Sequence, residues 1–357
     1  MKKKFTALFI YIAIITMTLF FSGCEQNAQN PPEGNTPTSE LVQSGEVSET
    51  PNESTNANIL FNLETGTVIL NNGIEMPVLG LGTYRLTAEE TVISVNAALT
   101  SGYSLIDTAA AYGNEEAVGQ GIKESGVPRE EVFITTKLWP NDYGNAAAAI
   151  DAALARLDLE YIDLLMLHQP WGDDYVAAYQ AMEAAVREGK VRSIGLSNFY
   201  QNSFNAIMAV AEIPPAVLQV ERNPYFQNAE MMEHIAPYGT VMMDWFPLGG
   251  RGDNVVPSER QQSLFENEVI LEIAEAHGKT AAQVILRWHI QSDGVAIPGS
   301  RNPAHILENI TIFDFALTEA EMQRIAGLET DIPSFDFREV VEQPDFESFT
   351  PPDDSDN

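Results

Sequence analysis

Apolar residues gather into short continuous runs along this chain, and these runs alternate with stretches in which apolar positions recur every three or four residues. The short runs predict β-strands buried on both faces, as in a parallel sheet, and the longer stretches predict amphipathic helices. The predicted strands span residues 78–84, 104–109, 132–139, 162–168, 193–198, 216–221, 240–246 and 294–300. The predicted helices span residues 88–102, 115–126, 146–157, 175–189, 201–211, 229–236, 268–278, 281–291 and 303–310.

Eight strand–helix units in succession predict an α/β fold, a (β/α)8 TIM barrel. A doubly wound parallel sheet is the alternative, but no GxGxxG follows the first strand to support it. Before the first strand, "TVILNNGIEMP" predicts a β-hairpin that turns at Asn72-Gly73. The barrel with its hairpin is expected to occupy residues 58–330, and residues 331–357 form an acidic C-terminal tail that follows the barrel surface at first and frays at its end.

The N-terminus has the features of an export signal. Lys2, Lys3 and Lys4 precede the apolar run "FTALFIYIAIITMTLFF", and small residues then lead to Cys24. This order favours a lipoprotein signal peptide over residues 1–23, with lipid attached to Cys24. A cleaved secretory signal and an uncleaved membrane anchor are the alternatives, since the run is close to the lower limit of roughly 17 residues for spanning a bilayer. Residues 24–57 beyond the cysteine are polar and predict a flexible tether.

The composition excludes several functional classes. Nineteen Lys and Arg against 51 Asp and Glu give a net charge of −32, which argues against nucleic acid or anionic lipid as a partner of the folded part and favours solubility. A single cysteine excludes an intrachain disulfide framework, and the five histidines are scattered without metal-ligand spacing. We therefore expect no metal cofactor.

Four chemically distinct side chains stand at three successive strand ends. The second strand leads to Asp107 and, in the following loop, to Tyr112; the third ends near Lys137, and the fourth ends at His168. Active sites of (β/α)8 barrels lie at the carboxyl ends of the strands, so these side chains are expected to converge. Each alone has a simpler interpretation, as a strand cap, its ion-pair partner, a packing ring or a core histidine.

Together the four groups suit carbonyl reduction. The alkoxide left by hydride addition needs a proton, and an unperturbed tyrosine with a pKa of about 10 donates it poorly at neutral pH. We expect the Lys137 ammonium to lower the pKa of Tyr112, and Asp107 to keep that ammonium charged and in place. His168 is expected to hydrogen-bond the carbonyl oxygen and orient it.

Long motifs in the same order along the chain resemble those of the aldo-keto reductase family, and most of all the bacterial branch that includes 2,5-diketogluconic acid reductases. They include "LNNGIEMPVLGLGTY", "GYSLIDTAAAYGNEEAVG", "ITTKLW", "LLMLHQP", "GKVRSIGLSNF" and "PAHILENITIFDFALT". The resemblance covers about residues 67–328. It implies an NADP(H)-dependent oxidoreductase that reduces an aldehyde or a ketone, with Tyr112 as general acid beside Lys137, Asp107 and His168.

The resemblance also implies further contacts. Trp139 is expected to line the substrate pocket with Tyr112 and His168. The residues expected to contact the cofactor are Thr83, Tyr84, Ser197, Asn198, Gln219, Trp245, Pro247, Leu248, Gly249, Ser300, Arg301, Asn302, His305, Glu308 and Asn309.

The sequence departs from the family pattern around the cofactor. Trp245 stands where a tyrosine usually stacks under the nicotinamide, and a tryptophan ring still provides a platform. Gly299 replaces a lysine that commonly meets the 2′-phosphate, which leaves Arg301 either as a phosphate partner or as a solvated arginine. NADP(H) is the favoured cofactor, and NAD(H) remains possible.

Two other functional classes are open at this point. A non-catalytic protein could keep the barrel and its cofactor site as a sensor or accessory subunit. A barrel glycosidase could use paired carboxylates such as Glu221 and Asp244, although this would leave the tyrosine, lysine and histidine unexplained. The remaining expectations are a monomer outside the cytoplasm, held on a membrane through lipid alone, with a small carbonyl compound as substrate.

Overall fold

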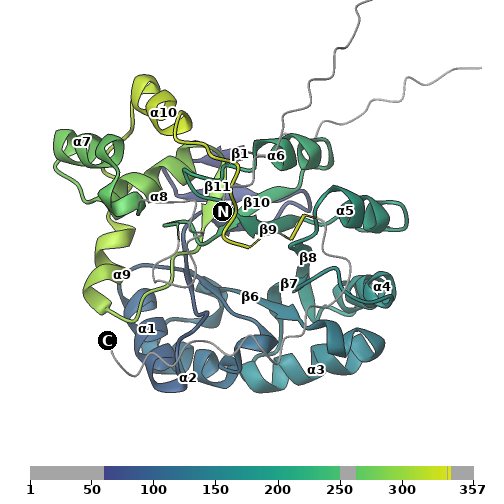
Figure 1. The fold of residues 1–357 in the computed structure, drawn as a ribbon. Coiled ribbons are helices and arrows are strands. Elements are labelled where there is room, and N and C mark those ends of the chain that lie inside the picture. Colours follow the sequence, from purple (N-terminus) through teal and green to yellow (C-terminus); the bar gives the residue numbers. More distant parts are fainter. Residues whose placement is uncertain (1–59, 250–262, 336, 339–357) are drawn as a thin grey trace, which may run out of the picture. The chain divides into compact units, whose positions relative to one another are not determined.

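The computed structural model describes residues 60–249, 263–335, 337 and 338 (Figure 1). Eight parallel strands follow one another around the sheet in chain order. They are β4 (Gly80–Gly82), β5 (Leu105–Asp107), β6 (Phe133–Leu138), β7 (Ile162–Leu167), β8 (Val191–Ser197), β9 (Val217–Glu221), β10 (Val241–Trp245) and β11 (Gly294–Ala296). All eight strands predicted from the apolar runs are confirmed.

The sheet closes between its first and last strands. The backbone N–H of Ala296 donates to the carbonyl of Val78 over 2.9 Å, and that of Gly82 donates to the carbonyl of Pro298 over 3.1 Å. Glycine is required at this junction, since a Cβ on Gly82 would lie 2.8 Å from the carbonyl oxygen of Ile297. The result is the predicted (β/α)8 barrel.

Helices form the outer layer of the barrel (Figure 1). They are α1 (Ala88–Thr100), α2 (Glu115–Ser125), α3 (Ala146–Leu157), α4 (Tyr175–Arg187), α5 (Gln201–Met208), α6 (Ala229–Ile235), α7 (Glu268–His277), α8 (Ala281–Gln291), α9 (Pro303–Ile310) and α10 (Glu319–Ala326). Short 3-10 turns are η1 (Ala110–Tyr112), η2 (Arg129–Glu131), η3 (Pro140–Asn145), η4 (Ala236–Tyr238) and η5 (Leu264–Glu266). The strands between these helices are almost wholly buried, which explains their continuous apolar runs.

The predicted hairpin is confirmed as β2 (Thr67–Ile69) paired with β3 (Glu75–Pro77). Gly73 lies in its turn with a φ of 82°, a conformation that glycine adopts without strain. The side chain of Asn71 donates to the carbonyls of Pro215 and Tyr238, just ahead of β9 and β10. The hairpin is thereby fixed at the amino-terminal end of the barrel, opposite the predicted site.

One strand and one α-helix of the described structure were not predicted from the sequence. The strand β1 (Leu60–Asn62) extends the hairpin to three strands, and its three residues are too few to show an alternating pattern. The helix α10 begins at a capping box in which Thr318 accepts from the backbone of Glu321 and the Glu321 carboxylate accepts from the backbone of Thr318. That box is readable in the sequence as Thr-x-x-Glu.

The predicted signal segment, Cys24 and the tether lie outside the described residues, as does most of the acidic tail. Of the tail, residues 331–335, 337 and 338 are described. Within residues 60–249, 263–335, 337 and 338, no helix combines the length and apolar character that crossing a bilayer needs.

Candidate active site

The four predicted catalytic side chains converge at the carboxyl end of the barrel. Asp107 is the last residue of β5, Lys137 lies near the end of β6, and His168 directly follows β7. Tyr112 ends the short turn η1 after β5. The rings of Tyr112 and His168 lie edge to face with centroids 5.7 Å apart, so one small ligand can meet both.

The Lys137 ammonium lies at the centre of this group. Its Nζ donates to Oδ2 and Oδ1 of Asp107 over 2.8 and 3.0 Å, and to the backbone carbonyl of Thr108 over 2.8 Å. The same Nζ lies 3.2 Å from the hydroxyl oxygen of Tyr112. Asp107 and Lys137 are both buried. Because the dielectric constant is lower there than in water, the two charges attract each other more strongly.

The Asp107 carboxylate is held by more than the lysine. Its Oδ1 accepts from Thr135 Oγ over 2.5 Å and from Gln219 Nε2 over 2.9 Å. Thr135 was not predicted as a site residue. It stands two residues before Lys137, which places both side chains on one face of β6, and that spacing could have revealed it.

The loop that carries Tyr112 is fixed by a buried asparagine. Asn114 accepts from Thr108 Oγ over 2.9 Å and donates to the backbone carbonyl of Thr83 over 2.9 Å. Gly113 between them has a φ of 68°, which lets the chain leave the 3-10 turn sharply. Tyr112 is therefore held against Lys137 by its own loop.

The pKa of Tyr112 differs from the expectation. Burial raises the pKa of the Tyr112 phenol well above its ordinary value of 10, and the Asp107 carboxylate and Tyr84 add to the rise. The expectation of a lowered pKa for Tyr112 is wrong, because burial disfavours the charged phenolate. Tyr112 therefore carries its proton at neutral pH and is a weaker acid than a free tyrosine, so it gives up that proton only to a strongly basic oxygen such as an alkoxide.

Burial affects the other two titratable groups in the opposite direction. Desolvation lowers the pKa of Lys137, while Asp107 and Glu115 oppose that fall. Desolvation also lowers the pKa of His168 well below 6.5, with a further contribution from Lys137. His168 is therefore a neutral imidazole at neutral pH. Its Nδ1 is buried and has no hydrogen-bond partner within the described part of the chain.

Polar side chains at the ends of β8 and β9 lie next to this group. The Asn198 amide donates to the carbonyl of His168 and to Ser197 Oγ, each over 3.2 Å. The Gln219 side chain lies in the same polar cluster, and its amide N–H donates a hydrogen bond to Asp107. Ser197, Asn198 and Gln219 are all buried, and their donors and acceptors suit recognition of a carboxamide.

Trp245 is the residue predicted to stack under the nicotinamide. Trp245 ends β10 half-buried, and its indole N–H donates to Oδ1 of Asn198 over 3.0 Å. Asn198 and Phe246, each just after a strand, have positive φ values of 62° and 49°. A non-glycine residue rarely adopts this conformation, and such residues cluster at functional sites.

A residue of the outer helix α8 binds the backbone of the segment that follows Trp245. His289 Nε2 donates to the carbonyl of Pro247 over 2.9 Å, and His289 Nδ1 lies 2.6 Å from Oδ2 of Asp244. Leu248 is half-buried, and Gly249 has a φ of 80° with Leu264 close to where a Cβ would stand. The next two loop residues, Gly250 and Arg251, lie outside the described residues.

The predicted phosphate contacts lie at the start of α9. Arg301 is exposed and its Nη1 lies 3.3 Å from Oε1 of Glu90 in α1. The Asn302 side chain caps α9 by accepting from the backbone of Ala304, and Ser300 Oγ accepts from the backbone of Asn302. Asn302 and Ser300 thus have local structural roles, and Arg301 pairs with an acid.

The remaining predicted cofactor residues differ in exposure. His305 is exposed, Asn309 is buried, and Glu308 accepts from the hydroxyl of Thr280 over 2.8 Å. At the other end of the site, Thr83 is buried and donates to the backbone carbonyl of Asp107.

One ring predicted to contact the cofactor and one predicted to line the substrate pocket pack against the tyrosine and the histidine. Tyr84 packs against Tyr112 with centroids 5.0 Å apart, and Trp139 packs edge-on against His168 at 5.1 Å. The two carboxylates considered for a glycosidase serve elsewhere. Glu221 binds the C-terminal segment, and Asp244 binds Arg222 and His289.

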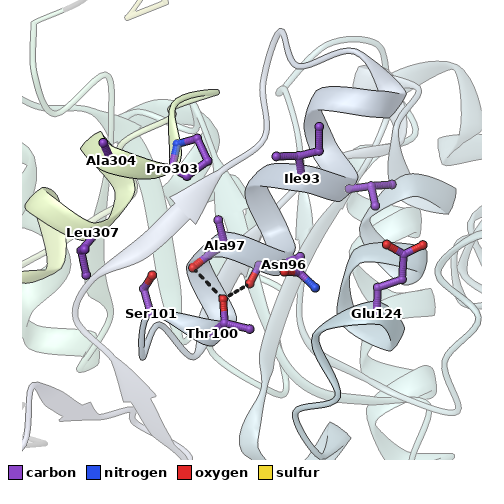
Figure 2. Close-up of a pocket in the computed structure, with 10 residues that line it drawn as sticks. Ile93, Asn96, Ala97, Thr100, Ser101, Glu124, Pro303, Ala304 and Leu307 are labelled. Atoms are coloured by element: carbon purple, nitrogen blue, oxygen red, sulfur yellow. Dashed lines mark hydrogen bonds between the residues drawn. The ribbon is translucent and has the colours of Figure 1, made fainter.

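Two further features lie apart from this group. A surface groove between α1 and α9, lined by residues that include Ile93, Ala97 and Leu307, belongs to the outer helix layer (Figure 2). It contains none of the four catalytic candidates. Within the residues described, no three histidine, cysteine, aspartate or glutamate side chains gather as a metal site would require.

Comparison with known proteins agrees with the arrangement. The model of the aldo/keto reductase family matches residues 78–330. The chain is 46% identical over 270 residues to morphine 6-dehydrogenase of Pseudomonas putida, covering 74% of this chain and 91% of that protein. It is 44% identical over 268 residues to glyoxal reductase of Bacillus subtilis, covering 74% and 93% of the two chains.

Solved structures show the same likeness. An aldo-keto reductase from a deep-sea metagenome library of the Medee basin superposes with a TM-score of 0.71 at 38% identity, covering 78% of this chain and 100% of that one. An aldo/keto reductase from Brucella melitensis gives a TM-score of 0.68 at 37% identity, covering 73% and 98%.

Proposed function

The chain belongs to the aldo/keto reductase family, and on that premise we propose that Tyr112, Lys137, Asp107 and His168 carry out the reduction of an aldehyde or a ketone. The protein is an oxidoreductase that acts on carbonyl or alcohol groups with a nicotinamide cofactor. One observation supports the residue assignment most strongly. The buried ammonium of Lys137 is hydrogen-bonded both to the Asp107 carboxylate and to the Tyr112 hydroxyl.

Each side chain has a separate role in the proposal. Bound nicotinamide supplies the hydride. Tyr112, protonated at neutral pH, gives its proton to the carbonyl oxygen, and the nearby Lys137 ammonium stabilises the phenolate that results. Neutral His168 donates a hydrogen bond to the same oxygen, and Trp139 limits where the carbonyl compound can lie. Asp107 keeps Lys137 in position.

We propose that Ser197, Asn198 and Gln219 hold the carboxamide and that Trp245 stacks on the nicotinamide ring. The donors and acceptors of these side chains fit an amide, and the half-buried indole is tied to Asn198. Pro247 to Gly249 would cover the pyrophosphate, with His289 holding the start of that segment. Thr83 and Tyr84 would lie at the far side of the nicotinamide.

We propose NADP(H) as the preferred cofactor, with Ser300, Arg301, Asn302 and His305 around the 2′-phosphate and Glu308 and Asn309 near the adenosine. The exposed guanidinium of Arg301 supports this, because it can exchange Glu90 for a phosphate with stronger charge-assisted hydrogen bonds. Gly299 stands where the family often has a lysine, so one positive charge near the 2′-phosphate is missing. This weakens the expected preference for NADP(H), and NAD(H) is the alternative cofactor.

The physiological substrate is a small carbonyl compound in this proposal. The motifs quoted above support a place near the branch of 2,5-diketogluconic acid reductases, and the named relatives act on glyoxal and on morphine according to their names. We further propose a monomer.

We also propose that the protein is exported and held on a membrane by lipid at Cys24. The support is the order of basic residues, apolar run, small residues, cysteine and polar tether in the sequence. Two acyl chains on one cysteine suffice for stable anchoring. Cell fractionation of the wild type and of Cys24→Ser tests this: release of the variant from the membrane fraction supports it, and equal membrane association contradicts it.

The activity is tested with purified protein lacking residues 1–24. Oxidation of NADPH and of NADH is followed at equal concentrations with methylglyoxal and with an aromatic aldehyde. Faster turnover with NADPH supports the proposal, equal or faster turnover with NADH overturns the cofactor preference, and no turnover with either overturns the proposed reaction.

A further inference from the structure

The carboxylate of Glu90 in α1 lies against the loop that leads into α9. Its Oε1 is 3.3 Å from Nη1 of Arg301, although the two residues are 211 positions apart in the sequence. The contact lies where α1 and α9 approach each other: Figure 2 shows Ile93, one turn after Glu90, lining the same groove as Pro303 at the start of α9. An acid of α1 therefore stands beside the loop proposed to hold the 2′-phosphate.

The position of Glu90 is fixed by the start of its own helix. Its Oε2 accepts from the backbone N–H of Thr87 over 2.9 Å, and the backbone N–H of Glu90 donates to Thr87 Oγ over 3.2 Å. These bonds form a capping box, at a helix end that favours negative charge. The backbone N–H of Thr87 lowers the pKa of Glu90 below its ordinary value of 4.5; partial burial opposes the fall, and Arg301 adds to it. Glu90 is therefore a fixed carboxylate at neutral pH.

The loop on the other side of the contact also has a defined shape. Ser300 Oγ accepts from the backbone N–H of Asn302 over 3.1 Å, and Asn302 Oδ1 accepts from the backbone N–H of Ala304 over 2.9 Å. Arg301 lies between them with about half of its side chain exposed. Because Gly299 has no side chain, Arg301 is the only charged residue in the stretch 299–302. A phosphate bound by this loop depends on that guanidinium.

The two possible cofactors differ at this place in charge. NADP(H) carries a 2′-phosphate with a charge of about −1.5 to −2, whereas NAD(H) carries a neutral 2′-hydroxyl. To bind Arg301, the phosphate must take the guanidinium from the Glu90 carboxylate or share it, and the two anions repel each other. A hydroxyl meets no such repulsion and can donate a hydrogen bond to a carboxylate. Since an exposed ion pair contributes little stability, a ligand can open this one without disturbing the fold.

We propose that Glu90 sets the balance between the two cofactors: it competes with the 2′-phosphate for the guanidinium of Arg301, lowers the preference for NADP(H), and allows NAD(H) to be used as well. Glu90 is a positioning residue that acts through Arg301 and takes no part in hydride or proton transfer. This inference rests on the proposed place of the 2′-phosphate and concerns cofactor choice at that site.

The test measures Kd for NADP+ and for NAD+ by titration calorimetry on the full chain and on Glu90→Gln. Glutamine keeps the capping box, because its amide oxygen can still accept from the backbone of Thr87. We expect the ratio of Kd for NAD+ to Kd for NADP+ to rise about five- to tenfold in the variant, as for the removal of one like charge near a phosphate. Kd for NAD+ itself should change less than about twofold, because NAD+ lacks the phosphate.

Two further variants separate competition for Arg301 from a general change of charge. Glu89→Gln removes the same charge from the neighbouring exposed position of α1 and should change the ratio less than about twofold. In a chain that also carries Arg301→Gln, Glu90→Gln should act by a smaller factor, since no guanidinium remains to be released. The effect of Glu90→Gln should also shrink at high salt, because exposed charges are screened.

Several results would overturn the inference. An unchanged ratio in Glu90→Gln would do so, as would an equal rise in Glu89→Gln. An equal factor with and without Arg301 would show that Glu90 does not compete for that side chain.

The cofactor proposal fails separately. A wild type that binds NAD+ more tightly than NADP+ contradicts the proposed preference for NADP(H), while the change of the ratio in Glu90→Gln still decides the inference. Absence of binding by both cofactors would overturn the proposed cofactor site together with the inference.

Discussion

The indole N–H of Trp245 donates to Oδ1 of Asn198 over 3.0 Å, which joins the end of β10 to the end of β8. Both residues are proposed to contact the nicotinamide, so this bond orients the stacking ring and the amide as one unit. Asn198 also has a positive φ, a conformation that is uncommon for residues other than glycine.

Replacing Trp245 with phenylalanine should weaken cofactor binding. The ring would remain as a platform, but the hydrogen bond to Asn198 would be lost, at a cost of about 1 kcal/mol. We expect Kd for the cofactor, measured by titration calorimetry, to rise about fivefold. An unchanged Kd would show that this bond has no part in forming the nicotinamide site.

The buried pair of Asp107 and Lys137 should show strong coupling. Lys137→Met alone should lower the free energy of unfolding by about 3–5 kcal/mol, because it leaves a buried carboxylate without its ammonium. The double variant Asp107→Asn with Lys137→Met should recover part of that loss while remaining inactive. Urea denaturation of the two single variants and the double variant gives the coupling energy. Strictly additive losses would contradict the described pair.

Stability should fall in mild acid because of His168. Burial lowers the pKa of His168 in the folded state, while the unfolded imidazole titrates near 6.5. Below that pH the unfolded state binds more protons than the folded state, so the free energy of unfolding falls as pH falls. His168→Asn should lose about 1 kcal/mol less than the wild type between pH 7.5 and 5.5. Denaturation at the two pH values checks this, and identical losses would argue against a buried neutral histidine.

Replacing Gly299 with lysine should increase the preference for NADPH over NADH. Gly299→Lys restores a cation beside the proposed 2′-phosphate, and a hydrogen bond to a charged group contributes about 1.5–3 kcal/mol. A new Cβ would lie 3.2 Å from the carbonyl oxygen of Gly82, so the backbone must shift by a few tenths of an ångström to take it. We expect the ratio of the Kd values for NADH and NADPH to increase about tenfold or more. Gly299→Met, of similar length without charge, is the matched control and should leave the ratio unchanged.

The sequence predicted the barrel and the convergence of the candidate catalytic side chains because both depend on local patterns. Buried parallel strands read as continuous apolar runs, and barrel topology then brings Asp107, Lys137 and His168 to one end. Thr135 could also have been predicted as a site residue, because it lies two residues before Lys137 and therefore on the same face of β6. The identities of these residues and their positions at strand ends were therefore sufficient to predict that they lie together.

Other features depend on contacts between distant segments and could not be predicted. Arg301 pairs with Glu90, 211 residues earlier, and Ser334 bonds Glu221 across 113 residues. The pKa of Tyr112 was assigned the wrong direction because the degree of burial at that loop is not readable from neighbouring residues. Only the packed structure shows that burial raises the pKa of Tyr112.

Tyr112 as the proton donor is the central assignment, and Tyr112→Phe tests it most directly. The variant keeps the ring beside Tyr84 and His168 and removes only the hydroxyl that Lys137 contacts. The decisive measurement is single-turnover reduction of methylglyoxal and of 4-nitrobenzaldehyde, with cofactor binding measured on the same sample. We predict a fall in the reduction rate of at least about a hundredfold with an unchanged cofactor Kd. A rate within a few-fold of the wild type would contradict the assignment.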